Sequence, residues 1–170
     1  MADKVKVYLA APLFGLTERR TNRELATAIM ALMPDVEIIL PQDFKYHGRF
    51  NDPRTFNTIF KTCVRGVDEA QVVVAILDGA DSDSGTCFEV GYAYAKGIPI
   101  IAVRTDYRAN QEKGVNLMLS QSCAIFVFRP AFDECIEALA NDIARALKRV
   151  LNQQPSVPKT RPATVGGRKP

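Results

Sequence analysis

Apolar runs alternate with amphipathic stretches along most of the chain, and this alternation predicts the fold. Five short runs rich in Val, Ile and Leu indicate strands at about residues 5–10, 36–40, 71–77, 98–103 and 124–128. Stretches with apolar residues at helical spacing indicate helices at about residues 18–33, 55–69, 85–96, near 116, and 131–151. Thr17 is the expected N-cap of the first helix. We therefore predict an α/β fold: a doubly wound, five-stranded, mainly parallel sheet with helices on both faces, flavodoxin- or Rossmann-like.

The C-terminus departs from this pattern. Residues 152–170 contain four prolines, four basic residues and no acidic residue. We predict one folded domain over residues 1–151, followed by a disordered, basic, proline-containing tail over residues 152–170. The tail contributes +4 to a total charge of +3, which leaves −1 for the domain. The domain therefore has no basic excess, and we expect no nucleic-acid partner.

Composition excludes several other classes of protein. No apolar run approaches the roughly 20 residues of a membrane span, and the N-terminus leads into the first strand without the layout of a signal peptide. We expect a cytoplasmic protein with no membrane partner. The four cysteines form no C-x-x-C pair and there is one histidine, so we expect no metal site. The chain has neither a G-x-G-x-x-G nor a Walker A motif, and we expect no cofactor.

Acidic residues are concentrated directly after the third apolar run. The segment from Asp78 to Glu89 contains three Asp and one Glu. It follows the carboxyl end of a predicted strand, which is where open α/β sheets bind ligands. Crowded carboxylates repel one another and are tolerated most readily where they do chemistry. Two carboxylates in distinct roles are what glycosyl transfer or glycoside hydrolysis requires.

Glu89 is the first candidate within the acidic segment. It falls in the first or second turn of a predicted helix, where the helix dipole would keep it ionised and ready as a nucleophile. The alternative is an ordinary surface Glu. Asp83 can approach the same pocket from the loop, or it can cap the helix, as can Ser84. Asp78 directly follows the strand, a common place for a ligand-binding carboxylate.

Polar residues outside the acidic segment are further candidates. Tyr8, in the first strand, can orient a carboxylate through its hydroxyl, or it can be an ordinary core aromatic. Asn116 can bind a sugar hydroxyl or belong to a plain helix. Arg19 and Arg20 begin a helix and can meet a phosphate, or they can be solvated.

Four motifs together resemble those of the nucleoside 2-deoxyribosyltransferase family. They are Tyr8-Leu-Ala-Ala-Pro-Leu-Phe14, Asp78-Gly79, Asp83-Ser-Gly-Thr-Cys-Phe-Glu89-Val-Gly-Tyr-Ala and Asn116-Leu-Met118. The resemblance covers about residues 4–150. It implies that residues 1–151 are a catalytic domain that transfers 2-deoxyribose between nucleobases by a retaining double displacement, through a covalent glycosyl-enzyme.

The resemblance also implies roles for individual residues. Glu89 would be the nucleophile that attacks C1′, Tyr8 the hydroxyl that positions it, and Asp83 the carboxyl that handles the base and its proton. Asn116 would reach the sugar 5′ end from a neighbouring subunit, with Met118 nearby. Further expected substrate-binding residues are Asp78, Gly79, Pro12, Phe14 and, by position only, Gln42. The implied partners are a nucleoside or nucleotide, a free nucleobase, and further copies of the chain in a homodimer or larger homo-oligomer.

Two other functions stay open at this point. Many members of the family carry an Asp just before the third strand, where this chain has Gln71, which leaves the base specificity open. The fold also resembles hydrolases that split nucleoside 5′-monophosphates, and Arg19, Arg20, Ser120 and Ser122 could supply the phosphate site that such an N-glycosidase needs. The third possibility is a non-catalytic nucleotide-binding domain, although a pure binder needs no nucleophile.

Overall fold

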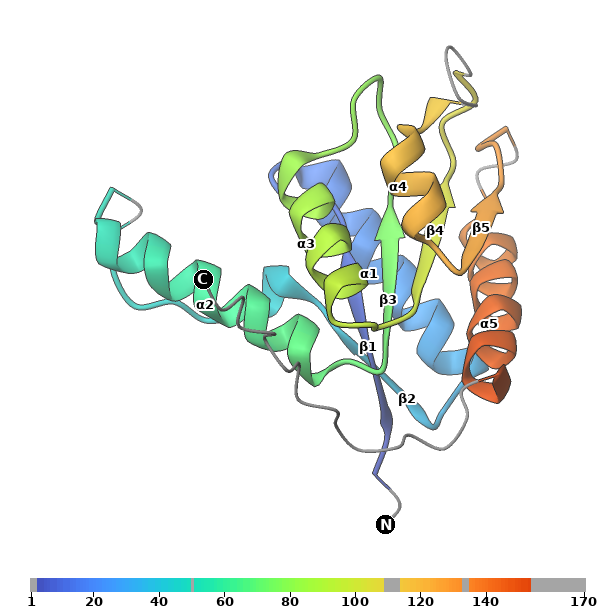
Figure 1. Ribbon diagram of the computed structural model, residues 1–170, viewed down its shortest axis with the longest axis horizontal. Helices are drawn as coiled ribbons and strands as arrows, with labels where there is room; N and C mark the ends of the chain where they lie inside the picture. The colour runs from blue at the N-terminus through green and yellow to red at the C-terminus, as the bar shows by residue number, and fades with distance from the viewer. Residues whose placement is uncertain (1–2, 50, 109–113, 133–134, 154–170) are drawn as a thin grey trace, which may run out of the picture.

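A single parallel sheet forms the centre of the computed structural model, which describes residues 3–49, 51–108, 114–132 and 135–153 (Figure 1). The strand order is β2-β1-β3-β4-β5, and every neighbouring pair is parallel. The strands are β1 (Val5–Ala10), β2 (Val36–Ile39), β3 (Val72–Ile76), β4 (Ile100–Arg104) and β5 (Ile125–Phe128). The predicted doubly wound α/β fold with five strands is confirmed.

Helices cover both faces of the sheet. They are α1 (Leu16–Leu32), the 3₁₀ turn η1 (Pro41–Asp43), α2 (Pro53–Glu69), α3 (Ser84–Ala95), α4 (Leu117–Ser122) and α5 (Ile136–Gln153). Figure 1 shows α3 and α4 in front of the sheet and α1 and α5 behind it. The beginning of α2 projects beyond the edge of the sheet.

Two hydrophobic cores result from the alternation of side chains along the strands. In β1, Val7 and Leu9 pack into the core that α1 and α5 close. Tyr8 and Ala10 face the other core, to which α2 and α3 contribute. Tyr8 is 0% exposed, although it carries a hydroxyl that needs a partner. The chain therefore buries a polar group in an inner strand of its sheet.

Two helix starts differ from the sequence-based prediction. The first helix begins at Leu16 with Gly15 as its N-cap, not at Thr17, because the Glu18 carboxylate accepts hydrogen bonds from the amides of Phe14 and Gly15. The last helix begins at Ile136, five residues after the predicted start. The amide of Ala131 donates to the carbonyl of Thr105, which keeps this part of the chain in the loop beside β4.

The last helix ends close to the boundary predicted between the domain and its tail. Helix α5 ends at Gln153, two residues beyond residue 151, and the rest of the predicted tail lies outside the described residues. In the part of the chain that the structure describes, none of the helices is both long and apolar enough to cross a membrane.

Candidate active site

A cavity of about 420 Å³ opens where the chain leaves β1 and β2. Its walls come from the loop after β1, from η1, from α2 and from the start of α3. The lining is mostly apolar, and its carboxyl and hydroxyl groups come from Asp83, Thr86, Glu89 and Tyr92. A wider depression of about 560 Å³ lies between α1 and α5 and contains none of the predicted site residues. The cavity beside α2 and α3 therefore has the character of a small-ligand site.

Tyr8 and Glu89 form a hydrogen-bonded pair at this cavity. The Tyr8 hydroxyl donates to Oε1 of Glu89 over 2.6 Å. The two residues are 81 positions apart, and the sheet brings β1 next to the helix that follows β3. The buried hydroxyl of β1 is thereby satisfied, and the second carboxyl oxygen of Glu89 is left for a ligand.

Burial raises the pKa of Glu89 to about 7. The Tyr8 hydrogen bond favours the carboxylate and opposes this rise, whereas the negative charge of Asp83 adds to it. The expectation that the helix dipole would keep Glu89 ionised is therefore wrong in direction. Glu89 is the sixth residue of α3, and the dipole effect falls off beyond the first turn. Burial and the Glu89 charge also raise the pKa of Tyr8 far above its usual value, so the phenol stays a donor.

Asp83 both caps α3 and lines the cavity. Its Oδ2 accepts hydrogen bonds from the Thr86 amide over 2.8 Å and from the Thr86 hydroxyl over 3.0 Å. Asp83 is the N-cap residue, so the capping alternative considered from the sequence is confirmed. The same side chain borders the cavity with Glu89. The two interpretations of this residue are compatible.

The surroundings of the Tyr8–Glu89 pair include residues that sequence reasoning missed. The thiol of Cys63, on α2, lines the cavity and interacts with the hydroxyls of Tyr8 and Tyr46, and burial raises its pKa. A Cβ atom on Gly66 would lie 2.8 Å from a ring carbon of Tyr8. Close helix approach thus fixes the ring of Tyr8 in place. Tyr46 and Cys63 are 17 positions apart along the chain, and this spacing gave no signal of the cluster.

Aromatic side chains form one wall of the cavity. The ring of Phe88 lies 5.6 Å from that of Phe60 and is stacked on that of Tyr92, with 6.2 Å between the centroids. Phe14 also lines the cavity and is 81% exposed, and Phe60 and Phe88 are about half exposed. The spacing of Phe88 and Tyr92, four residues apart on one helix, was a usable sequence signal for this wall.

Phe14 and both chain neighbours of Pro12 line the cavity, whereas Gln42 is hydrogen-bonded to a residue outside it. Ala11 and Leu13, on either side of Pro12, both line the cavity, as does Pro41. Gln42 donates from Nε2 to the Arg19 carbonyl over 2.9 Å, and the Arg19 guanidinium donates to the Gln42 carbonyl over 3.2 Å. Gln42 and Arg19 thus join η1 to α1, and neither lines the cavity.

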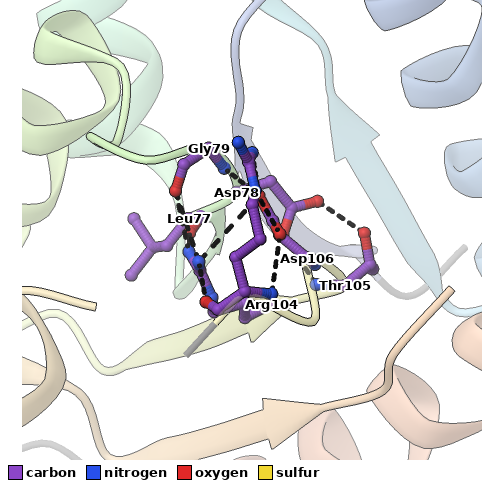
Figure 2. Close-up of polar contacts among 7 residues, drawn as sticks. Leu77, Asp78, Gly79, Arg104, Thr105 and Asp106 are labelled. Carbon is purple, nitrogen blue, oxygen red and sulfur yellow. Dashed lines mark hydrogen bonds and ion pairs between the residues drawn. The ribbon is translucent and has the colours of Figure 1, made fainter. Parts of the chain in front are cut away.

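Asp78 and Gly79 lie outside the cavity lining. The Asp78 carboxylate accepts hydrogen bonds from the Thr105 amide and hydroxyl, both over 2.6 Å, and from the Asp106 amide over 2.9 Å (Figure 2). The Gly79 amide donates to the Asp106 carboxylate over 3.1 Å. These residues connect the loops that follow β3 and β4.

Asn116 and Met118 mark the start of α4, away from this cavity. The Asn116 side-chain oxygen accepts a hydrogen bond from the Met118 amide over 2.9 Å, so it caps the helix. Both residues line a separate hollow of about 330 Å³ with Asp81, Ser82 and Cys87. Met118 is 77% exposed. Within one chain they do not reach Glu89's cavity.

The other proposed phosphate ligands are engaged elsewhere. Arg20 pairs with Glu24 over 2.7 Å. The hydroxyls of Ser120 and Ser122 donate to carbonyls of their own helix. Of the described residues that line the cavity, none is Lys or Arg. Within the described ranges, no cluster of three or more His, Cys, Asp or Glu could hold a metal ion.

Gln71 lies at the opposite end of β3 from the cavity. Its side-chain oxygen accepts from the amide of Lys6, at the amino ends of the strands. Asp68, three residues earlier on α2, instead accepts a hydrogen bond from the hydroxyl of Tyr92 over 2.9 Å and pairs with Lys96 over 2.9 Å. Asp68, and not the residue at position 71, is thus the group hydrogen-bonded to the cavity wall through Tyr92.

Comparison with protein families gives one match that spans more than half of the chain. The sequence profile described as nucleoside 2-deoxyribosyltransferase matches residues 7–118. This range includes Tyr8, Asp83, Glu89 and the Asn116–Met118 motif.

Solved structures with a similar fold include enzymes and a protein described only as conserved. The conserved protein of Enterococcus faecalis is 25% identical, with a TM-score of 0.66 over 84% of this chain and 99% of that one. A 2-deoxyribosyltransferase of Bacillus psychrosaccharolyticus is 21% identical, with a TM-score of 0.61 over 82% and 90%. A CMP N-glycosidase of Clostridium botulinum is 16% identical, with a TM-score of 0.54 over 84% and 98%. These similarities extend the shared fold to most of the chain.

Proposed function

The chain belongs to the nucleoside 2-deoxyribosyltransferase family, and from this premise we propose that it transfers 2-deoxyribose between nucleobases through Glu89. The family places it among glycosyl-transferring or N-glycosidase enzymes. The observation that carries the finer proposal is the 2.6 Å hydrogen bond from Tyr8 to Glu89 at the cavity. It holds one carboxyl oxygen and leaves the other to react.

The first step breaks the bond between C1′ and the base nitrogen. The free oxygen of the Glu89 carboxylate forms a bond to C1′ as the electron pair of the C–N bond passes to the base. We assign to Asp83, which lines the same cavity, the transfer of a proton to the departing base. Oxocarbenium character at C1′ is stabilised by the adjacent carboxylate before the covalent bond is complete.

The second step reverses the first with another base. A nitrogen of the acceptor attacks C1′, Glu89 leaves as a carboxylate, and the acceptor passes its proton to the Asp83 carboxylate. Two inversions at C1′ retain its configuration. The apolar and aromatic walls limit access of water to the glycosyl-enzyme, which favours transfer over hydrolysis. The exposed ring of Phe14 offers a face on which a base can stack.

The cavity lining favours nucleosides over nucleoside 5′-monophosphates. A phosphate group needs cationic or multiple hydrogen-bond donors, and the described lining contains no Lys or Arg. The competing N-glycosidase assignment therefore has less support. A non-catalytic binding role leaves the buried Tyr8–Glu89 pair unexplained.

We also propose that the active site is shared between subunits. Asn116 and Met118 do not line Glu89's cavity, and both lie at an exposed helix start. The neighbouring surface carries the exposed apolar side chains of Leu117, Phe126 and Phe128. A homodimer or larger homo-oligomer that buries this surface would bring Asn116 to the sugar of a neighbouring site.

A direct assay separates the competing functions. The purified protein is incubated with deoxyinosine or deoxycytidine plus free adenine, and separately with deoxycytidine 5′-monophosphate, and products are resolved by chromatography. The proposal predicts deoxyadenosine that depends on added adenine. Free cytosine from the monophosphate without an exchange product would assign the chain to the N-glycosidases. No product in either reaction would support the binding role.

The pH dependence of transfer should report the ionisation of Glu89. The nucleophile must be deprotonated and its pKa is about 7, so kcat/KM should rise with pH and level off above a midpoint near pH 7. Initial rates at low nucleoside concentration, measured from pH 5.5 to 8.5, give this midpoint. A flat profile over that range would contradict the assignment of Glu89 as the ionising nucleophile.

Substitution of Gly66 should disturb the active site through Tyr8. An added methyl group would lie 2.8 Å from Tyr8 and 3.1 Å from Phe44, so Gly66→Ala should shift the ring and lower kcat/KM about tenfold or more. Gly91→Ala is the matched control, because a Cβ there meets nothing within 4 Å. We expect the control to keep its activity and to gain up to about 1 kcal/mol of stability from helix propensity. Equal activity of the two variants would contradict the role of close packing against Tyr8.

A further inference from the structure

Arg104 is a fully buried cation at the carboxyl end of β4, with 1% of its surface exposed. Its guanidinium donates to the Leu77 carbonyl over 2.6 Å and to the Gly79 carbonyl over 3.3 Å (Figure 2). It also donates to the Arg108 carbonyl over 2.9 Å, and the Asp106 carboxylate lies 3.9 Å away. A buried charge is costly unless it is paired and hydrogen-bonded. The cation therefore holds carbonyls of two separate loops.

Reciprocal aspartates reinforce the link between these loops. Asp78, in the loop after β3, accepts from the amides of Thr105 and Asp106 in the loop after β4. Asp106 in turn accepts from the Gly79 amide. Each loop thus supplies a carboxylate to the backbone of the other, and Arg104 fixes the carbonyls between them. Figure 2 shows the residues of both loops together beside the side chain of Arg104.

The chain that leads into α4 also packs on this guanidinium. A Cβ on Gly114 would lie 2.7 Å from Nη2 of Arg104 and 2.4 Å from the Arg108 carbonyl. Gly114 has φ of +81°, a conformation that favours glycine. Asn116, the cap of α4, follows two residues later. One buried side chain thus contacts the loop after β3, the loop after β4 and the approach to α4.

We propose that Arg104 is a positioning residue for the transfer reaction, acting through the loop of residues 77–83 on Asp83. This inference rests on the proposed function. Arg104 does not line the cavity, so it does not touch substrate. It fixes the carbonyls of Leu77 and Gly79, and Asp83 follows four residues after Gly79. Because the loop is fixed at Leu77 and Gly79, the Asp83 carboxyl at its other end is held in one position at the cavity.

A double-mutant cycle tests the coupling between Arg104 and Asp83. Arg104→Lys keeps the charge but loses the planar fork that spans several carbonyls. We expect it to lower kcat/KM about 10- to 100-fold, as misplacement of a catalytic group does. In an Asp83→Asn background, which retains a capping side chain, the same substitution should change kcat/KM less than about threefold. In a Tyr8→Phe background, Arg104→Lys should still lower kcat/KM by its full factor.

The controls separate positioning from general stability. Arg129→Lys alters another arginine just after a strand, which pairs with Asp142 over 3.1 Å, and should change kcat/KM less than about threefold. Thr105→Val removes one hydrogen bond to Asp78 at nearly constant shape and gives a second route to the same readout if Arg104→Lys does not fold. Its smaller loss should also disappear in the Asp83→Asn background.

Two results would overturn the inference. One is full activity of Arg104→Lys and Thr105→Val, and the other is an equal loss in the Asp83→Asn and Tyr8→Phe backgrounds, which would indicate a general structural role. Failure of the proposed function has a different signature: wild-type protein would form no exchange product, or Asp83→Asn and Tyr8→Phe alone would leave its rate unchanged.

Discussion

Replacing Glu89 by Gln should abolish deoxyribosyl transfer while leaving the protein folded. An amide oxygen is a poor nucleophile, and loss of the covalent route should lower kcat by at least about 10⁴-fold. The measurement is the rate of deoxyadenosine formation together with a search for the glycosyl-enzyme by intact mass spectrometry. Glu137→Gln, on the exposed face of α5, is the matched control and should be fully active. Transfer by Glu89→Gln at more than about 1% of the wild-type rate would refute covalent catalysis by Glu89.

The same substitution should stabilise the protein at alkaline pH. A carboxyl whose pKa is raised in the folded state contributes stability below its unfolded pKa, and this contribution is lost as pH rises through the folded pKa, here about 7. Above pH 7 the wild-type chain therefore carries the cost of a buried charge, which Gln removes. We expect Glu89→Gln to be more stable than wild type by about 1–3 kcal/mol at pH 8 and to lose this advantage at pH 5. Thermal unfolding at the two pH values measures the difference, and global unfolding of the variant would contradict the site as described.

Replacing Tyr8 by Phe should have the second largest effect. The variant loses a 2.6 Å hydrogen bond to a carboxylate. Hydrogen bonds to charged groups contribute about 1.5–3 kcal/mol, so kcat/KM should fall about 10- to 100-fold. Because the Tyr8 hydrogen bond lowers the pKa of Glu89, its removal should also move the midpoint of the pH profile to higher pH. A lower rate with an unchanged midpoint would show that Tyr8 acts only by packing.

Tyr94→Phe is the matched control for this experiment. Tyr94 lies on the same helix as Glu89 but is 64% exposed and does not line the cavity. We expect unchanged kcat/KM and an unchanged pH midpoint. A fall in kcat/KM in both Tyr8→Phe and Tyr94→Phe would indicate that removing any tyrosine hydroxyl from this region disturbs the protein.

The strand–helix order was readable from the sequence because each element carries its own pattern. The apolar run of Val72–Ile76 is buried on both faces of the sheet, and such runs are distinctive. The ends of helices and strands were less predictable where a contact with a distant part of the chain decides them. The Thr105 carbonyl holds Ala131 outside the last helix, 26 residues away. No local propensity signals such a contact.

The candidate site was predictable in its residue types and less so in its electrostatics. Glu89, Asp83 and Tyr8 stood out by position, and the structure brings them to one region. The raised pKa of Glu89 depends on burial in the folded protein, which no short motif records. The roles of Cys63 and Gly66 depend on how α2 crosses β1, again a property of packing.

The position of β1 in the sheet has a consequence for synthesis of the chain. Val5–Ala10 leave the ribosome before either of their neighbours in the sheet, because β1 lies between β2 and β3, and β3 begins only at Val72. The nascent chain therefore carries an apolar strand whose second partner is not yet made, and parallel pairing across such a distance is slow. Because Glu89 is translated later still, the Tyr8 hydroxyl gains its carboxylate partner only after the rest of this part of the sheet has been made. Until β3 is made, β1 keeps an unpaired edge, and such an edge can pair with other chains.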